Sequence, residues 1–84
     1  MSDEVKVGEV IKFFAQPSVA AIKAIAGIKV GDELRFKGTT TDFVQAVESM
    51  QVDNAVVSEV QSGALVGIKV NDRVRPGDDV LKAS

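Results

Sequence analysis

The chain has 84 residues, of which 45% are hydrophobic and 26% are charged, and its formal net charge at pH 7 is −2. These values predict one folded domain over residues 1–84, with a core over about residues 5–82 and a flexible tail at residues 1–4. The sequence contains no cysteine and no histidine, which excludes disulfides, thiol chemistry and metal sites built on those residues. The small negative charge argues against a protein that coats nucleic acid with its whole surface.

The start of the chain bears on where the protein acts. Residues 1–4 include two acidic side chains, and no long apolar run follows them. We therefore expect neither a secretion signal nor a membrane span, and we expect the protein to act in the cytoplasm.

Residues 5–14 alternate well enough to predict a first strand. The apolar residues of one parity in this segment are Val5, Val7, Ile11 and Phe13, with the acidic residue at position 9 as the exception. Gly8 lies inside the run, where a glycine predicts a bulge or a close approach of another segment.

Two segments leave helix and strand open. Residues 19–26 have a capping residue before them, Gly27 after them and helical apolar spacing, but they provide only about two helical turns. Residues 42–52 begin with a capping-box pattern, and their spacing slightly favours a helix. A strand there requires a change of parity, which a bulge near residues 48–49 would supply.

Two Gly-Asp pairs punctuate the chain. Gly31-Asp32 precedes a run on which Leu34 and Phe36 share one face, and Gly77-Asp78 precedes a last strand over residues 79–82. Glycine can adopt the positive φ of a tight turn, and aspartate can accept hydrogen bonds from nearby backbone amides. We expect both pairs to form turns that start strands.

The clearest strand covers residues 64–70, where Val66, Ile68 and Val70 share a face. Residues 56–60 form a short apolar piece that fits either helix or strand. The chain has four phenylalanines and no other aromatic residue, and we expect all four in the core.

Four stretches in order resemble domain 2 of the translational GTPases, the small β-barrel that follows the G domain in elongation factor Tu. They are residues 28–34 (IKVGDEL), 47–51 (VESMQ), 62–68 (SGALVGI) and 74–81 (VRPGDDVL). The resemblance covers about residues 5–82 and extends to the small stand-alone translation elongation factor-like proteins. A similar barrel is appended to some collagenase-type peptidase-like proteins, where residues 8–10, 40–43 and 47–51 recur.

This resemblance implies an all-β fold, a small closed antiparallel barrel of about six or seven strands of the reductase/isomerase/elongation factor type. It decides both ambiguous segments in favour of strand. Barrel closure hides the sheet edges, which suits a domain of this size.

The sequence predicts no catalytic activity, no cofactor, no metal and no bound nucleotide. The phosphate-binding loop of a GTPase is missing, because no Gly-x-x-x-x-Gly-Lys-Ser/Thr pattern occurs. Ser49 has no histidine to activate it as a nucleophile. The acidic pairs at residues 32–33 and 78–79 are explained more simply as turn residues than as ligands of a divalent metal.

The best candidate for function is a basic cluster of Lys69, Arg73 and Arg75, three cations within seven residues. Such a patch can bind phosphates, and the resembling barrel contacts the acceptor end of tRNA in elongation factor Tu. The alternative interpretation is a solvated rim that balances neighbouring aspartates.

Two functions follow. The first is a non-catalytic module of translation that binds RNA (tRNA or the ribosome) or a translation component. The alternative is a protein-interaction barrel that serves as an accessory subunit to a separately encoded partner, such as a peptidase-like protein.

Overall fold

The computed structural model describes residues 4–16 and 18–83, so the predicted tail lies outside the described residues except for Glu4. The described residues form strands, turns and loops, with no helix among them. The strands are β1 (Glu4–Phe14), β2 (Val19–Ala24), β3 (Ile28–Lys29), β4 (Glu33–Lys37), β5 (Asp42–Ala46), β6 (Met50–Val52), β7 (Ala55–Val57), β8 (Glu59–Val60), β9 (Leu65–Lys69) and β10 (Asp79–Ala83). The all-β prediction is confirmed. No helix in the described part of the chain is long and apolar enough to cross a membrane.

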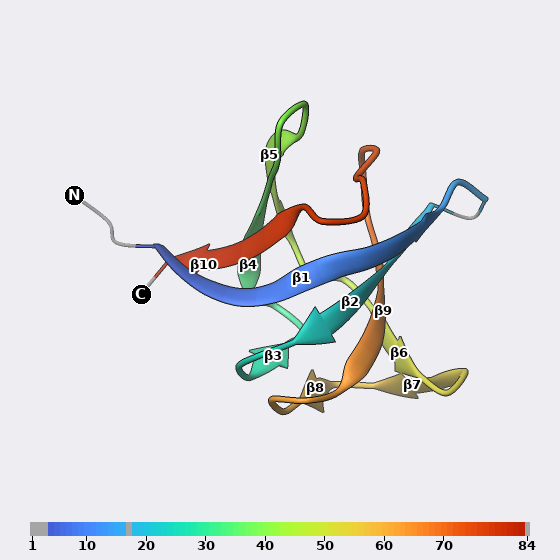
Figure 1. Cartoon of the computed structure of the whole chain (residues 1–84). Coiled ribbons are helices and arrows are strands. Elements are labelled where there is room, and N and C mark those ends of the chain that lie inside the picture. The colour runs from blue at the N-terminus through green and yellow to red at the C-terminus, as the bar shows by residue number, and fades with distance from the viewer. Residues whose placement is uncertain (1–3, 17, 84) are drawn as a thin grey trace.

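Eight strands form one antiparallel sheet in the order β5-β4-β10-β1-β2-β9-β6-β7, and β3 pairs with β8 in a separate ribbon. The long β1 crosses the middle of the sheet, which curls around the core as a half-barrel (Figure 1). The predicted closed barrel of six or seven strands is wrong, because the order ends at β5 and β7, which do not pair with each other. The reductase/isomerase/elongation factor assignment is accordingly unconfirmed.

The segment between β5 and β6 continues the contacts that β5 makes with β4. Residues 47–49 connect β5 to β6 without joining a ladder. Val47 instead bonds with the turn before β4: its N–H donates to the carbonyl of Asp32 (2.8 Å), and its carbonyl accepts from the N–H of Gly31 (2.9 Å). These bonds extend the β4–β5 pairing beyond the pair of Glu33 and Ala46.

Both ambiguous segments are strands. In β2, Ala20, Ile22 and Ala24 are fully buried, and the strand is paired on both sides, with β1 and with β9. The sequence of β2 does not show the apolar–polar alternation of a strand, because the outward residues Val19 and Ala21 are also apolar. Residues 42–52 contain two strands, β5 and β6, separated by a break at 47–49 rather than by a bulge in one strand.

The register of β1 shifts twice, once between Lys6 and Gly8 and again between Val10 and Lys12. The predicted irregularity at Gly8 is confirmed, and a Cβ there would lie 2.8 Å from Cγ2 of Ile22. Because each shift changes which residues face inward, Val10 is buried although the alternation had placed it outside. Two of the residues expected inside, Val5 and Ile11, are about half exposed, at 49% and 48%.

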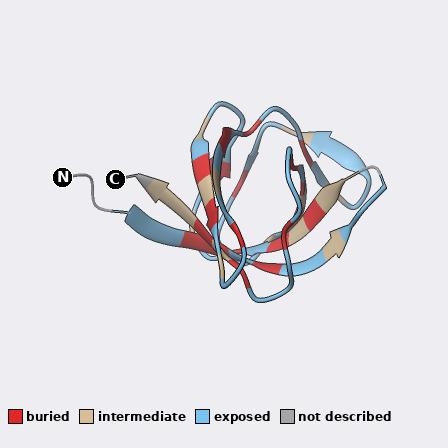
Figure 2. Ribbon diagram, turned by 90° about the horizontal axis from the view of Figure 1, so that it is seen from above, coloured by how far each residue is buried: buried red, intermediate tan, exposed pale blue. Residues whose placement is uncertain are grey.

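The core lies on the concave side of the sheet, where the buried segments gather in Figure 2. Leu34 and Phe36 are both fully buried, as the pattern after the first Gly-Asp pair predicted. Phe36 stacks on Phe43 with ring centroids 5.1 Å apart. The prediction that all four phenylalanines are core residues is wrong for Phe14, which is 45% exposed on the outer side of β1.

The two Gly-Asp turns have the same hydrogen bonds. Gly31 and Gly77 have φ values of 98° and 95°. In each turn the aspartate N–H donates to the carbonyl three residues earlier, and one carboxylate oxygen accepts the N–H of that same residue, which is Lys29 for Asp32 and Arg75 for Asp78. The turns start β4 and β10, which pair with each other, so the prediction that they launch strands is confirmed.

Candidate functional site

Arg73 and Arg75 project from the loop of residues 71–78, which joins β9 to β10. Val74 lies between them and is buried, with 1% of its surface exposed, so it fixes the loop on the core. Because side chains alternate along extended backbone, the two arginines, which precede and follow Val74, both point outward. Both are exposed.

Two buried polar side chains hold the ends of this loop. At its start, the Gln45 side chain donates to the carbonyl of Lys69 (2.9 Å) and accepts the N–H of Asn71 (2.6 Å). At its end, the Asp78 carboxylate accepts the N–H of Arg75 at 2.9 Å. Buried backbone groups without partners are costly, so these bonds define the path of the loop.

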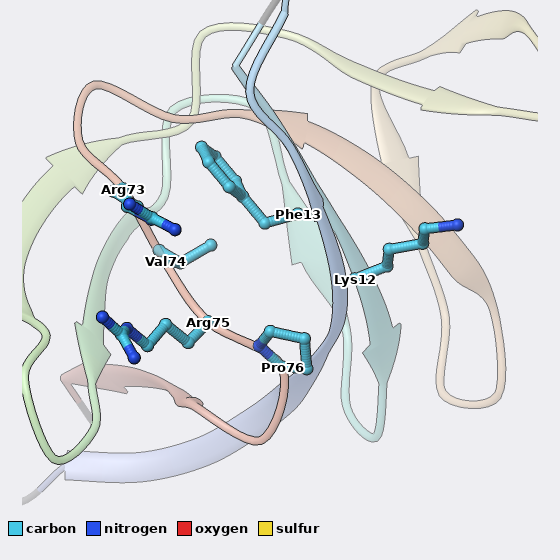
Figure 3. Close-up of a pocket in the computed structure, with 6 residues that line it drawn as sticks. All are labelled: Lys12, Phe13, Arg73, Val74, Arg75 and Pro76. Carbon is cyan, nitrogen blue, oxygen red and sulfur yellow. The ribbon is translucent and has the colours of Figure 1, made fainter.

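The two arginines border two adjacent depressions. The larger, of about 450 Å³, is lined by Phe13, Val74 and Pro76 together with both arginines and Lys12 (Figure 3). The other, of about 300 Å³, lies against residues 40–43 of the β4–β5 hairpin and also contacts Asp72. In Figure 3 the Lys12 side chain turns away from Arg73 and Arg75, across the ribbon of β1.

The nearby carboxylates leave the two guanidinium groups available to a ligand. Asp42, which lines the smaller depression, accepts a bidentate pair of hydrogen bonds from Arg35: Nε donates to Oδ1 at 2.8 Å and Nη2 donates to Oδ2 at 2.9 Å. These hydrogen bonds from Arg35 lower the pKa of the Asp42 carboxyl below its ordinary value. The same bonds raise the pKa of Arg35. Asp72 accepts the backbone N–H of Arg73 at 2.7 Å. Within residues 4–16 and 18–83, neither Arg73 nor Arg75 forms an ion pair.

The structure brings together two of the three residues of the predicted basic cluster. Lys69, at the end of β9, lines a different depression, of about 280 Å³, with Val19, Ser49, Gln51 and Gly67. In its place, Phe13 of β1 joins the arginine site. No sequence signal indicates this, because the association depends on two long-range bonds between Val10 and the second Gly-Asp turn: Val10 N–H to Asp78 carbonyl (2.9 Å) and Gly77 N–H to Val10 carbonyl (2.8 Å).

The chemistry available here is recognition of anions. A guanidinium group presents planar donors that match the two oxygens of a carboxylate. The described residues contain no group of three or more acidic side chains arranged to hold a metal ion. That the protein is not an enzyme, and that Lys69, Arg73 and Arg75 bind a ligand, stay predictions.

The comparisons with known proteins point to proteases. The chain is 37% identical over 78 residues to an uncharacterized protease of Methanocaldococcus jannaschii, which covers 92% of this chain and 19% of the protease. It is 31% identical over 81 residues to a collagenase of Porphyromonas gingivalis, covering 94% of this chain and 20% of the collagenase. The chain thus spans about a fifth of the length of these relatives. No family model matches it.

Two solved structures have the same fold. Both are crystal structures of the C-terminal domain of a putative U32 peptidase from Geobacillus thermoleovorans. One has a TM-score of 0.89 at 20% identity and covers 93% of this chain and 99% of the other. The second has a TM-score of 0.84 at 18% identity, with coverages of 94% and 91%.

These findings correct the resemblance to elongation factors. The relatives are named as an uncharacterized protease and collagenases, and the matching fold is the C-terminal domain of a putative U32 peptidase. The stretches at residues 28–34 and 74–81 misled because they contain the two Gly-Asp turns and the strands they start, which serve the fold and identify no ligand. The predictions of a role in translation and of RNA binding are therefore wrong, and tRNA and the ribosome have no support as partners. The likeness to the domain appended to collagenase-type proteins is the part of the resemblance that holds.

Proposed function

We propose that this chain is a non-catalytic accessory domain that binds the catalytic part of a peptidase-like protein and positions it. The observation that carries the proposal is the extent of the match. Nearly the whole chain is similar to a fifth of a protease and of a collagenase. The same fold was crystallised by itself as the C-terminal domain of a putative peptidase, which supports a separable unit.

The residues present support a binding role rather than chemistry. The chain has no histidine and no cysteine, the side chains most used as general base and thiol nucleophile. Ser49 is exposed and lines a depression with Val19, Gln51, Gly67 and Lys69, none of which is a carboxylate or an imidazole. In this proposal the reaction is carried out by residues outside this fold, in the cytoplasm.

Arg73 and Arg75 provide the first contact in this proposal. Their guanidinium groups bind Asp or Glu side chains on the peptidase-like partner, because neither forms an ion pair within the described residues. Exposed charges of this kind act mainly on partner selection and on the rate of association, so the interaction should weaken as salt is raised.

The test is a calorimetric titration of this chain into the M. jannaschii protease from which the 78 matched residues have been deleted. We expect a one-to-one complex. The full-length protease should bind more weakly, because its own domain occupies the position. If the deleted protease does not bind this chain at either low or moderate salt, the proposed function is wrong.

The arginine contact has a matched control. Changing Arg73→Glu and Arg75→Glu together should weaken the complex at least tenfold and reduce its dependence on salt. For either single arginine variant, Lys29→Glu alters the net charge equally at an exposed position away from the site, and it should leave the affinity within about twofold.

A further inference from the structure

The outward side of the sheet differs between its two halves. One half contains β4, β5, β10 and the first part of β1, and the other contains the second part of β1 with β2, β9, β6 and β7 (Figure 1). The first half is covered by ion pairs: Lys6 with Glu9 (3.3 Å) and with Asp79 (3.0 Å), and Arg35 with Glu4 (3.2 Å) and with Asp42 (2.8 Å). These charged side chains on the first half of the sheet are therefore already paired with one another.

The second half is apolar, and we name it the apolar face. Eight large apolar side chains are exposed in the described part of the chain, and four lie here: Ile11 at 48%, Phe14 at 45%, Leu65 at 62% and Val56 at 76%. Exposed apolar side chains scattered singly are ordinary, but a contiguous group marks an interaction surface.

The strand register defines a row of outward residues across this half of the sheet, which contains Val56 and lies beside Leu65, two positions before Gly67 on β9. Ala21 of β2 lies opposite Lys12 of β1 and Gly67 of β9. Gly67 lies opposite Gln51 of β6, and Gln51 lies opposite Val56 of β7. Directly paired residues in neighbouring strands project on the same side of a sheet, so this row crosses all five strands.

The middle of the row is hollow. Ala21 and Gly67 have the smallest side chains on the face, and a depression of about 420 Å³ lies over them, bordered by Ile11, Leu65 and Asp53. A Cβ at Gly67 would lie 3.3 Å from Cγ1 of Val19, which lines the same depression, so a side chain at residue 67 would fill part of the hollow. The face can therefore receive a protruding apolar side chain.

Three lysines border the apolar face without partners. Lys12, Lys23 and Lys69 are exposed, and across residues 4–16 and 18–83 none of them forms an ion pair. The Lys12 ammonium lies over the ring of Phe14, 5.2 Å from its centroid. Glu9 lies opposite Lys23 in the register, but its carboxylate is bonded to Lys6. The predicted residue Lys69 thus belongs to this face and not to the arginine site.

We propose that the apolar face docks on the peptidase-like partner, at an apolar patch that is bordered by Asp and Glu side chains. This inference rests on the proposed function and adds a second contact surface to the arginine site. Unpaired lysines around an apolar centre complement carboxylates around an apolar centre. A second copy of this chain is a poor occupant, because two such faces would bring lysines against lysines.

The test uses the same titration as the proposed function, with substitutions on this face. Leu65→Glu and Val56→Glu replace exposed side chains, so the fold should persist, as urea unfolding of each variant will verify. Each should weaken binding at least tenfold, and Lys69→Glu should weaken it severalfold. Val44→Glu is the matched control, since Val44 is 53% exposed on β5 in the ion-paired half, and it should change the affinity less than twofold.

The outcomes separate this inference from the function on which it rests. If the unaltered chain binds the deleted protease while Leu65→Glu and Val56→Glu bind equally well, the docking face is wrong and the proposed function stands. If the unaltered chain does not bind, the function itself fails. If sedimentation shows a dimer that Leu65→Glu dissociates, the face binds a second copy and the inference is overturned.

Discussion

The carboxylate of Asp78 occupies the space in which a side chain at Gly38 would lie. A Cβ built on Gly38 would overlap Oδ1 of Asp78, while the other carboxylate oxygen accepts the N–H of Arg75. Asp78 is only 6% exposed. The β4–β5 hairpin and the arginine loop are therefore packed through a single buried carboxylate, and the loop can lie where it does because residue 38 has no side chain.

Gly38→Ala should consequently destabilise the domain. The added methyl group must displace either the hairpin or the Asp78 carboxylate, and overpacking of this kind typically costs about 1–3 kcal/mol. For a domain of this size, each kcal/mol lowers the melting temperature by roughly 4–8 °C. Gly27→Ala is the control, because the nearest atom to its Cβ would be the carbonyl oxygen of Val60 at an ordinary 3.7 Å. Equal melting temperatures for the two variants would contradict the packing argument.

The turn glycines allow a different prediction, since no atom lies within 4 Å of a Cβ at Gly31 or at Gly77. Any cost of Gly31→Ala or Gly77→Ala must therefore come from the backbone, whose φ values of 98° and 95° suit glycine. We expect about 1–2 kcal/mol for each, measured by urea unfolding. Because β4 and β10 are antiparallel, the two turns lie at opposite ends of the pair, so the cost of the double variant should equal the sum of the two single costs to within about 0.5 kcal/mol.

Much of the fold could be predicted from the sequence because local chemistry determines it. The Gly-Asp pairs, the burial of Leu34 and Phe36, and the strand containing Val66 and Ile68 all depend on near neighbours. Which side of β1 faces inward could not be predicted, because the register shifts at Gly8 and Val10 are set by pairing with strands far along the chain. Closure of the sheet was also wrongly predicted, because pairing between β5 and β7 would be a long-range contact that no local pattern reports.

The candidate site was predictable only where it is continuous in the sequence. Arg73 and Arg75 flank one buried residue, so their positions in the sequence already place them together. Lys69 is the last residue of β9, and its side chain faces the other side of the sheet. The apolar face was missed entirely. It is assembled from five strands. In the sequence its apolar residues look like core residues, and only the pairing of the strands shows that they face outward.

The Arg35–Asp42 pair predicts how one surface bond responds to pH. Hydrogen bonding to Arg35 lowers the pKa of Asp42, so its carboxylate favours the folded state above the ordinary aspartate pKa of about 3.9. That contribution is lost as the pH falls from there through the lowered pKa of the folded state. Arg35→Gln should raise the pKa of Asp42 toward its ordinary value in an NMR titration of the side-chain carboxyl. An unchanged Asp42 titration would show that Arg35 is not the cause.

Gln45 offers the sharpest test of how the arginine loop is held. It is 7% exposed, and its amide both donates to the carbonyl of Lys69 and accepts from the N–H of Asn71. Gln45→Glu keeps the acceptor but removes the donor, and at neutral pH it sets a buried carboxylate against a carbonyl oxygen. The expected loss is about 1–3 kcal/mol by urea unfolding at pH 7.

The pH dependence of that loss distinguishes the hydrogen bond from simple packing. Burial and the facing carbonyl should raise the pKa of the new carboxyl above the roughly 4.3 of an unfolded glutamate. Between those two values the folded state binds the extra proton, so the deficit relative to the unaltered chain should shrink as the pH falls from 7 toward 4.5, because the protonated acid can again donate to Lys69. Gln51→Glu, at an exposed position on β6, should show no such recovery. A deficit for Gln45→Glu that is constant with pH would mean that the Lys69 carbonyl does not depend on this donor.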